Sequence, residues 1–117
     1  MIKSFGMLKR KKGLPVEQFL EHWEKVHAPL FLSKNPPGLR KYIQDHPAKG
    51  AGVEFETDID GIAELWFDDV ESLQAFYQWL SSSDEARDLQ EDGKLFINFE
   101  ESLLFAVEEH VLKELTV

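Results

Sequence analysis

The chain has 117 residues, a formal net charge of −9 and no cysteine. Its length fits a single domain over residues 1–117 with one hydrophobic core, and the lack of cysteine excludes disulfides and thiol catalysis. The negative charge argues against a nucleic-acid partner, because such domains present a basic surface to phosphates. Without an apolar run near the roughly 20 residues that cross a bilayer, or a leader-like N-terminus, we expect no membrane partner and a cytoplasmic location.

The first residues predict a strand that ends in a turn. Residues 2–8 mix β-branched, aromatic and apolar types without a helical repeat, as in a strand. A basic run, Lys9-Arg10-Lys11-Lys12, follows and leads into Gly13-Leu14-Pro15. We interpret this run as a solvated turn and not as a phosphate site.

A helix is predicted from Pro15 onward, because proline suits a first helical turn. Apolar and aromatic residues then recur at intervals of three and four, at Val16, Phe19, Leu20, Trp23, His27 and Leu30. Pro29 removes a backbone donor, so regular helix should stop or kink near residues 26–28. This places His27 at a helix end.

The middle of the chain predicts two more strands. Residues 39–46 follow the breaker Asn35-Pro36-Pro37-Gly38 and form the second strand, and residues 62–67 form the third. The segment between them, from Pro47 to Gly61, is rich in Gly, Ala, Asp and Glu. We expect it to be a mobile flap or an irregular edge.

The last part of the chain predicts a second long helix and a final strand. Asp68 and Glu71 resemble a capping box, and the helix stripe then follows at Val70, Leu73, Phe76, Tyr77 and Leu80. A shorter helix is expected around residues 84–90 and the fourth strand over residues 103–111.

This element order predicts an α+β protein with the ferredoxin-like βαββαβ layout. In that layout a four-stranded antiparallel sheet carries its helices on one face. The strands are rich in apolar and aromatic residues, and the helices are too few to cover the second face. We therefore expect a homodimer in which two sheets close a dimeric α+β barrel.

His27 is the leading candidate for a catalytic residue. It lies on the apolar stripe of the first helix, and an imidazole can accept or donate a proton near neutral pH. The alternative is a half-buried histidine that bonds to a neighbouring carbonyl group.

Tyr42 and His46 are the other catalytic candidates, because they share one face of the second strand. Tyr42 can donate a hydrogen bond and His46 can exchange a proton. Arg40 and Gln44 lie on the same face and make it polar for a plain core. The alternative is that these residues face solvent.

Glu64 and Trp66 share a face of the third strand. Desolvation beside Trp66 would raise the pKa of Glu64. The alternative is that Trp66 packs while Glu64 pairs with a basic neighbour such as Arg40 or Lys41. The expected substrate-binding residues are Trp23, Glu64, Leu65 and Trp66.

The sequence favours neither a metal nor a cofactor. His22 and His27 are five residues apart, about 140° around an α-helix, and so should not grip one ion. The sequence has no zinc, calcium, phosphate-loop or dinucleotide pattern, and no serine nucleophile elbow. Haem held by a histidine stays as a weaker alternative.

Several segments resemble the EthD family, in the order in which that family has them. They are Leu8–Leu14, Phe19…Trp23…Val26-His27-Ala28-Pro29-Leu30, Gly38–Tyr42, Asp60–Phe67 and Glu108–Val111. The resemblance covers nearly the whole chain and implies a dimeric α+β barrel. Proteins of this fold group include lactone isomerases, polyketide cyclases, dehydratases, decarboxylases and monooxygenases, so the fold is a weak guide to the reaction.

The resemblance strengthens two of the site candidates. Similar isomerases use a histidine and a tyrosine at the positions that His27 and Tyr42 match. They can carry a reactive cysteine where this chain has Leu65, which argues against a lactone-isomerase mechanism.

Two hypotheses about function follow. The first is a cofactor-independent enzyme for a small organic acid, lactone or aromatic compound, in which His27 moves a proton, Tyr42 binds a carbonyl oxygen and His46 assists. An oxidoreductase-associated role on such a compound is the other form of this enzyme hypothesis. The second hypothesis is a non-catalytic accessory or metabolite-binding protein of an oxygenase or degradation pathway.

Overall fold

The computed structural model describes residues 1–50, 52–53 and 57–115. Within this part of the chain the elements are β1 (Ile2–Leu8), α1 (Val16–His22), the π-helical η1 (Trp23–His27), α2 (Ala28–Ser33), β2 (Lys41–Asp45), β3 (Gly61–Phe67), α3 (Val70–Ser82), the 3₁₀ turn η2 (Asp84–Ala86), α4 (Arg87–Phe96) and β4 (Leu103–Glu108).

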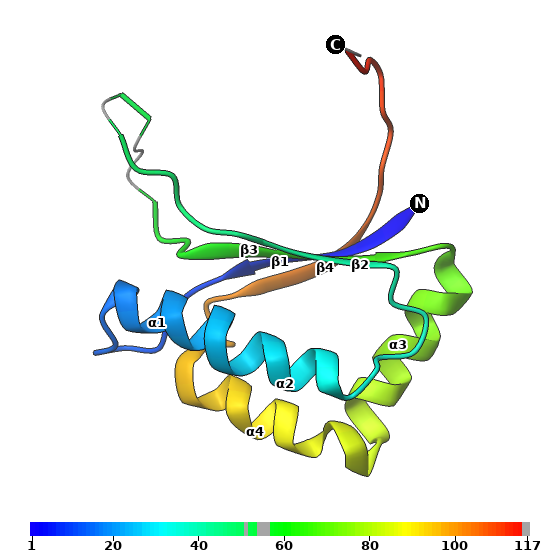
Figure 1. Ribbon diagram of the computed structural model, residues 1–117, viewed down its shortest axis with the longest axis horizontal. Coiled ribbons are helices and arrows are strands. Elements are labelled where there is room, and N and C mark those ends of the chain that lie inside the picture. The colour runs from blue at the N-terminus through cyan, green and yellow to red at the C-terminus, as the bar shows by residue number, and fades with distance from the viewer. Residues whose placement is uncertain (51, 54–56, 116–117) are drawn as a thin grey trace.

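The four strands form one antiparallel sheet in the order β2-β3-β1-β4. Figure 1 shows α1, α2, α3 and α4 gathered on one side of this sheet, while its other side carries none of the helices in the described part of the chain. The strand register places Ser4 of β1 opposite Leu65 of β3, and Leu65 opposite Tyr42 of β2. The ferredoxin-like α+β prediction is therefore confirmed.

The first helix is longer than predicted and changes its geometry partway along. The backbone N–H of Ala28 donates to the carbonyl of Trp23, five residues back, which defines a π-helical turn. Pro29 follows as the second residue of α2, where it cannot donate to the carbonyl of Lys25. The predicted irregularity is present, but the helix continues to Ser33, so the prediction that His27 ends a helix was wrong.

The core between the sheet and the helices has two buried parts. One gathers Phe31, Phe67, Leu73, Phe76, Ala86 and Leu89. The other gathers Phe19, Trp23, Phe96 and Ile97. Aromatic rings fill most of both, and burial of a large side chain contributes about 1.5–3 kcal/mol.

Several element boundaries differ from the prediction. The cap of α3 is Asp69, whose side chain accepts from the backbone N–H of Ser72, so the capping box at Asp68 was wrong. The helix expected over residues 84–90 begins as a 3₁₀ turn and continues as α4 to Phe96. The fourth strand ends at Glu108.

The segment from Pro47 to Gly61 was predicted to be a flap or an irregular edge. Residues 51 and 54–56 of this segment lie outside the described part of the chain. At the described positions before β3, the segment contains neither helix nor strand. It approaches β1 at its end, where the backbone N–H of Asp60 donates to the carbonyl of Leu8 at 2.8 Å.

Among the helices in the described ranges, none combines the length and the apolar character that a membrane span requires.

Candidate active site

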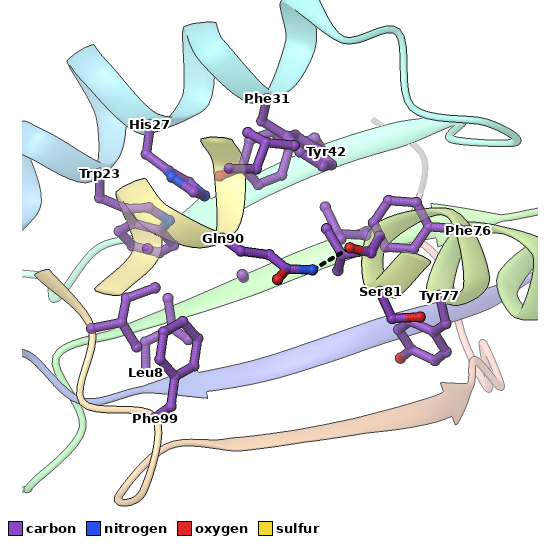
Figure 2. Close-up of a pocket in the computed structure, with 16 residues that line it drawn as sticks. Leu8, Trp23, His27, Phe31, Tyr42, Phe76, Tyr77, Ser81, Gln90 and Phe99 are labelled. Atoms are coloured by element: carbon purple, nitrogen blue, oxygen red, sulfur yellow. Dashed lines mark hydrogen bonds between the residues drawn. The ribbon is translucent and has the colours of Figure 1, made fainter. Parts of the chain in front are cut away.

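A cavity of about 520 Å³ lies between the sheet and the helices. This volume falls within the ~300–1,000 Å³ range of small-molecule sites. Its walls come from the first helix, three strands, α3 and α4 and the residues after α4: Leu8, Trp23, His27, Phe31, Tyr42, Ala63, Leu65, Phe76, Tyr77, Leu80, Ser81, Leu89, Gln90, Gly93, Ile97 and Phe99. Figure 2 shows the His27 ring pointing into this space, with Gln90 reaching in from α4.

His27 is held by a carboxylate behind it. Its Nδ1 lies 2.8 Å from Oδ2 of Asp92 on α4, and the two side chains are 17% and 12% exposed. A carboxylate can only accept, so the neutral imidazole must donate from Nδ1. Nε2 then carries the lone pair, and in this tautomer His27 can act as a base toward the cavity.

His22 binds the other oxygen of the same carboxylate. Its Nε2 lies 2.9 Å from Oδ1 of Asp92. The sequence analysis had separated His22 from His27 by assuming a regular α-helix. The π-helical turn at Trp23–His27 reduces that offset, because it contains more residues per turn than an α-helix, and both rings reach Asp92, so the predicted divergence of the two rings was wrong.

Burial sets the protonation of His27. Desolvation lowers the pKa of His27 below its ordinary value, and the nearby Asp92 carboxylate opposes this shift only in part. The neutral, proton-accepting form of His27 is therefore favoured near pH 7.

Tyr42 reaches the cavity from β2, opposite the first helix. Its hydroxyl oxygen accepts a hydrogen bond from Nε2 of Gln44 at 2.6 Å. The same Gln44 nitrogen donates to the carbonyl of Trp23 at 3.0 Å. Burial raises the pKa of Tyr42, so the phenol keeps its proton as a donor.

His46 lies beside the site and does not line the cavity. Its ring stacks on Trp23 at a centroid distance of 5.1 Å, and its Nε2 lies 3.0 Å from Oε1 of Gln44. Gln44 therefore connects His46 to Tyr42, and any influence of His46 on the cavity passes through Gln44 and Trp23.

The predicted substrate-binding residues divide between the two faces of the sheet. Trp23 and Leu65 line the cavity. Glu64 and Trp66 lie on the opposite face with Lys3 and Lys41. The structure thus brings Trp23 and Leu65 together with His27 and Tyr42, and keeps Glu64 and Trp66 apart from them.

Glu64 and Trp66 belong to a group of paired charges on that opposite face. Lys3 donates to Glu64 at 2.8 Å and lies 4.5 Å from the Trp66 ring centroid. The pKa of Glu64 is lowered, chiefly by a hydrogen bond from Asp45 and then by Lys3, so the reading with a raised pKa was wrong. Below about pH 6 the proton of this pair lies on Asp45, whose pKa is raised to about 6 by its hydrogen bond to Glu64. The alternative, in which Glu64 pairs with a basic neighbour, agrees with the structure, but the partner is Lys3 and not Arg40 or Lys41.

The basic run makes contacts inside the chain. Arg10 donates from its backbone N–H and its guanidinium to Asp60, a side chain 7% exposed, at 2.8 and 2.6 Å. Lys11 donates to the carbonyl of Lys94 at 3.0 Å. These contacts fix the turn to the loop before β3 and to α4.

Across residues 1–50, 52–53 and 57–115, no three histidine or acidic side chains gather in an arrangement that would hold a metal ion.

The sequence analysis missed Asp92, which is the partner of both histidines. A signal was present, because Asp92 lies four residues before Phe96 and three after Leu89, two residues that α4 buries. A carboxylate on the buried side of an amphipathic helix needs a partner. The predicted helix ended at residue 90, and so Asp92 was left out of consideration.

The family model described as EthD domain matches residues 11–100. No curated protein sequence matches the chain.

Solved structures also resemble this one. An EthD family protein from Bacillus halodurans is 25% identical with a TM-score of 0.68, and the match covers 94% of this chain and 99% of that one. A protein from Arabidopsis thaliana is 12% identical with a TM-score of 0.66, covering 97% and 100%. A dimeric protein with a ferredoxin-like fold from Bacteroides fragilis is 14% identical with a TM-score of 0.54, covering 92% and 95%. The last two share the fold alone.

Proposed function

The chain belongs to the EthD family, and from this premise we propose that it is a cofactor-independent enzyme that moves a proton on a small organic substrate. One observation carries the proposal: His27 lines an apolar cavity, and the Asp92 carboxylate holds its Nδ1. This is the arrangement of a general base whose tautomer is fixed.

The proposed chemistry begins at carbon. Nε2 of His27 takes a proton from a carbon next to a carbonyl group, and the bonding pair moves toward the carbonyl oxygen to form an enolate. The Tyr42 hydroxyl donates a hydrogen bond to that oxygen. Asp92 stabilises the imidazolium that forms, because its carboxylate accepts from Nδ1.

The fate of the enolate decides the reaction class. Return of the proton to another atom gives an isomerisation, and departure of a β-hydroxyl group as water gives a dehydration. Attack on a second carbonyl within the substrate gives a cyclisation. The first step is common to all three, so it can be tested before the product is known.

The test is deuterium exchange. Small lactones, cyclic ketones and hydroxyaromatic ketones are incubated with the protein in D₂O, and exchange of the C–H next to the carbonyl is followed by NMR. We expect the protein to accelerate exchange for at least one compound, and His27→Gln to abolish the acceleration. Binding without exchange for any compound would favour the second hypothesis, a metabolite-binding accessory protein.

We also propose a homodimer through the face of the sheet that carries no helix. Large apolar residues lie on it, with Phe105 46% and Leu103 60% exposed. Phe5 and Phe105 pair across β1 and β4 with ring centroids 5.6 Å apart. The description of similar solved structures as dimeric supports the proposal. In light scattering, Phe105→Glu should convert a dimer to a monomer; a dimer that persists would contradict it.

A further inference from the structure

The residues of the cavity wall restrict the charge that a bound ligand can carry. Among the sixteen residues that line the cavity, none is Lys, Arg, Asp or Glu. A carboxylate bound there would find no cation, and burial of an unpaired charge is costly. The same cost applies to an ammonium group without a carboxylate in contact.

The charges around the cavity further disfavour the binding of an anionic ligand. Asp92 lies directly behind His27 and places a negative charge against this part of the cavity wall. Burial lowers the pKa of His27, which therefore does not supply a compensating cation near pH 7. The whole chain carries a net charge of −9.

The aromatic side chains of the cavity wall favour a ligand with a flat ring system. Six aromatic side chains line the cavity, on the first helix, β2, α3 and the segment after α4: Trp23, Phe31, Tyr42, Phe76, Tyr77 and Phe99. Their rings pack well against other rings by stacking and edge contacts. Figure 2 shows Phe31 and Tyr42 on one side of the space and Phe99 on another.

The polar groups that line the cavity are neutral. His27 and Tyr42 line it from the first helix and β2, where Nε2 accepts and the phenol donates. Tyr77 of α3 donates to the buried Ser4 at 2.8 Å, and Gln90 of α4 donates from its amide nitrogen to the carbonyl of Leu80. The amide oxygen of Gln90 can then accept from a ligand hydroxyl group.

Building on the proposed function, we infer that the substrate class is uncharged aromatic compounds, with a hydroxyl or enolisable carbonyl at the His27 end and a second oxygen toward Gln90. This narrows the sequence-based hypothesis, which had included organic acids.

Calorimetry with ligands of one shape tests the inference. 2-Naphthol, 2-naphthoate and 2-naphthylmethylammonium share the ring system and differ in charge, and decahydro-2-naphthol keeps the hydroxyl without the aromatic ring. At pH 7 we expect 2-naphthol to bind at least about tenfold tighter than either ion. It should bind roughly threefold or more tighter than decahydro-2-naphthol. Equal or tighter binding of 2-naphthoate, or no binding of 2-naphthol, overturns the inference.

A charge introduced at the cavity rim gives a second test. Gln90 lines the cavity and is exposed, so Gln90→Lys places a cation there with little effect on the core. We expect this variant to bind 2-naphthoate about tenfold tighter than the unmodified protein does. Gln74→Lys on α3 adds the same charge at an exposed position outside the cavity wall and should leave 2-naphthoate binding unchanged. Equal gains in both variants would contradict the inference.

These results separate the ligand class from the reaction. Tight binding of 2-naphthol without deuterium exchange on any carbonyl compound would keep the ligand class and reject the enzyme. Exchange on a carboxylate substrate, with 2-naphthol unbound, would keep the enzyme and reject the ligand class.

Discussion

The two faces of the sheet differ in the charge state of the ionisable groups that they carry. On the helix-covered face, burial keeps His27 neutral and Tyr42 protonated beside an apolar cavity. On the other face, Lys3 and Glu64 form an ion pair at 2.8 Å. Beside the cavity, a group whose charged form is disfavoured can exchange a proton with a ligand. On the open face, the Lys3–Glu64 pair links β1 to β3. This difference supports the proposal that the chemistry takes place on the helix-covered face and the subunit contact on the other.

The largest effect should follow from loss of the base. For a substrate found by deuterium exchange, His27→Gln should lower kcat by about 10²–10⁴-fold, the range for positioned proton transfer. Glutamine can still donate to Asp92, so the fold should persist, as circular dichroism would show. On the other face, Lys3→Met should leave kcat nearly unchanged. Retention of full turnover by His27→Gln would remove His27 from the mechanism.

Asp92→Asn should have the next largest effect. A hydrogen bond to a charged group contributes about 1.5–3 kcal/mol, which corresponds to roughly 10–100-fold in turnover. Because the Asp92 carboxylate raises the pKa of His27, its neutralisation should lower that pKa further. Histidine NMR titration measures the shift directly, and a merely structural role for Asp92 would leave the pKa of His27 in place. A higher pKa in the variant would contradict the assignment.

The packing of Trp23 against the sheet gives a smaller effect, on stability. A Cβ added at Gly61 would lie 2.5 Å from the Trp23 ring, so Gly61→Ala must displace a side chain that lines the cavity. We expect a loss of about 1–3 kcal/mol in the free energy of unfolding, measured by urea denaturation. Gly6→Ala is the matched control on the neighbouring strand, since its nearest contact is an ordinary 3.4 Å. Equal losses in the two variants would show that Trp23 is not tightly packed.

The smallest effect belongs to the pair of carboxyl groups on the open face. The pKa of Asp45 rises from an ordinary 3.8 to about 6, so the folded state binds more protons than the unfolded state between these values. This contribution to stability therefore falls as the pH rises through that window. In Asp45→Asn the decline should be absent, whereas Asp58→Asn should retain it; thermal unfolding at a series of pH values measures both. If stability still declines over this pH range in Asp45→Asn, the proton that Asp45 shares with Glu64 is not its cause.

Sequence reasoning predicted the fold well because periodicity is a local property. The short, mostly apolar run of residues 62–67 and the helical spacing of Leu73, Phe76, Tyr77 and Leu80 identified β3 and α3 within one or two residues. The site was predicted only in part. His27 and Tyr42 were selected as pocket residues and line the cavity, while their roles in catalysis stay predictions.

The remaining features depend on contacts between distant segments. His27 and Asp92 are 65 residues apart in the sequence, and no local pattern predicts which acidic residue contacts which histidine. The convergence of His22 on the same acid depends on a π-helical turn, which sequence spacing alone does not reveal. The face occupied by Glu64 and Trp66 was left open because either face of a strand fits an alternating pattern.

A crystal structure of the protein with bound 2-naphthol tests the central claim most directly, because it locates both the ligand and the subunit contact. The account predicts the ring inside the cavity with its hydroxyl group at Nε2 of His27, and two subunits joined through the face that carries Trp66. A ligand bound against Trp66 and Lys3, with the cavity filled by protein side chains, would contradict it.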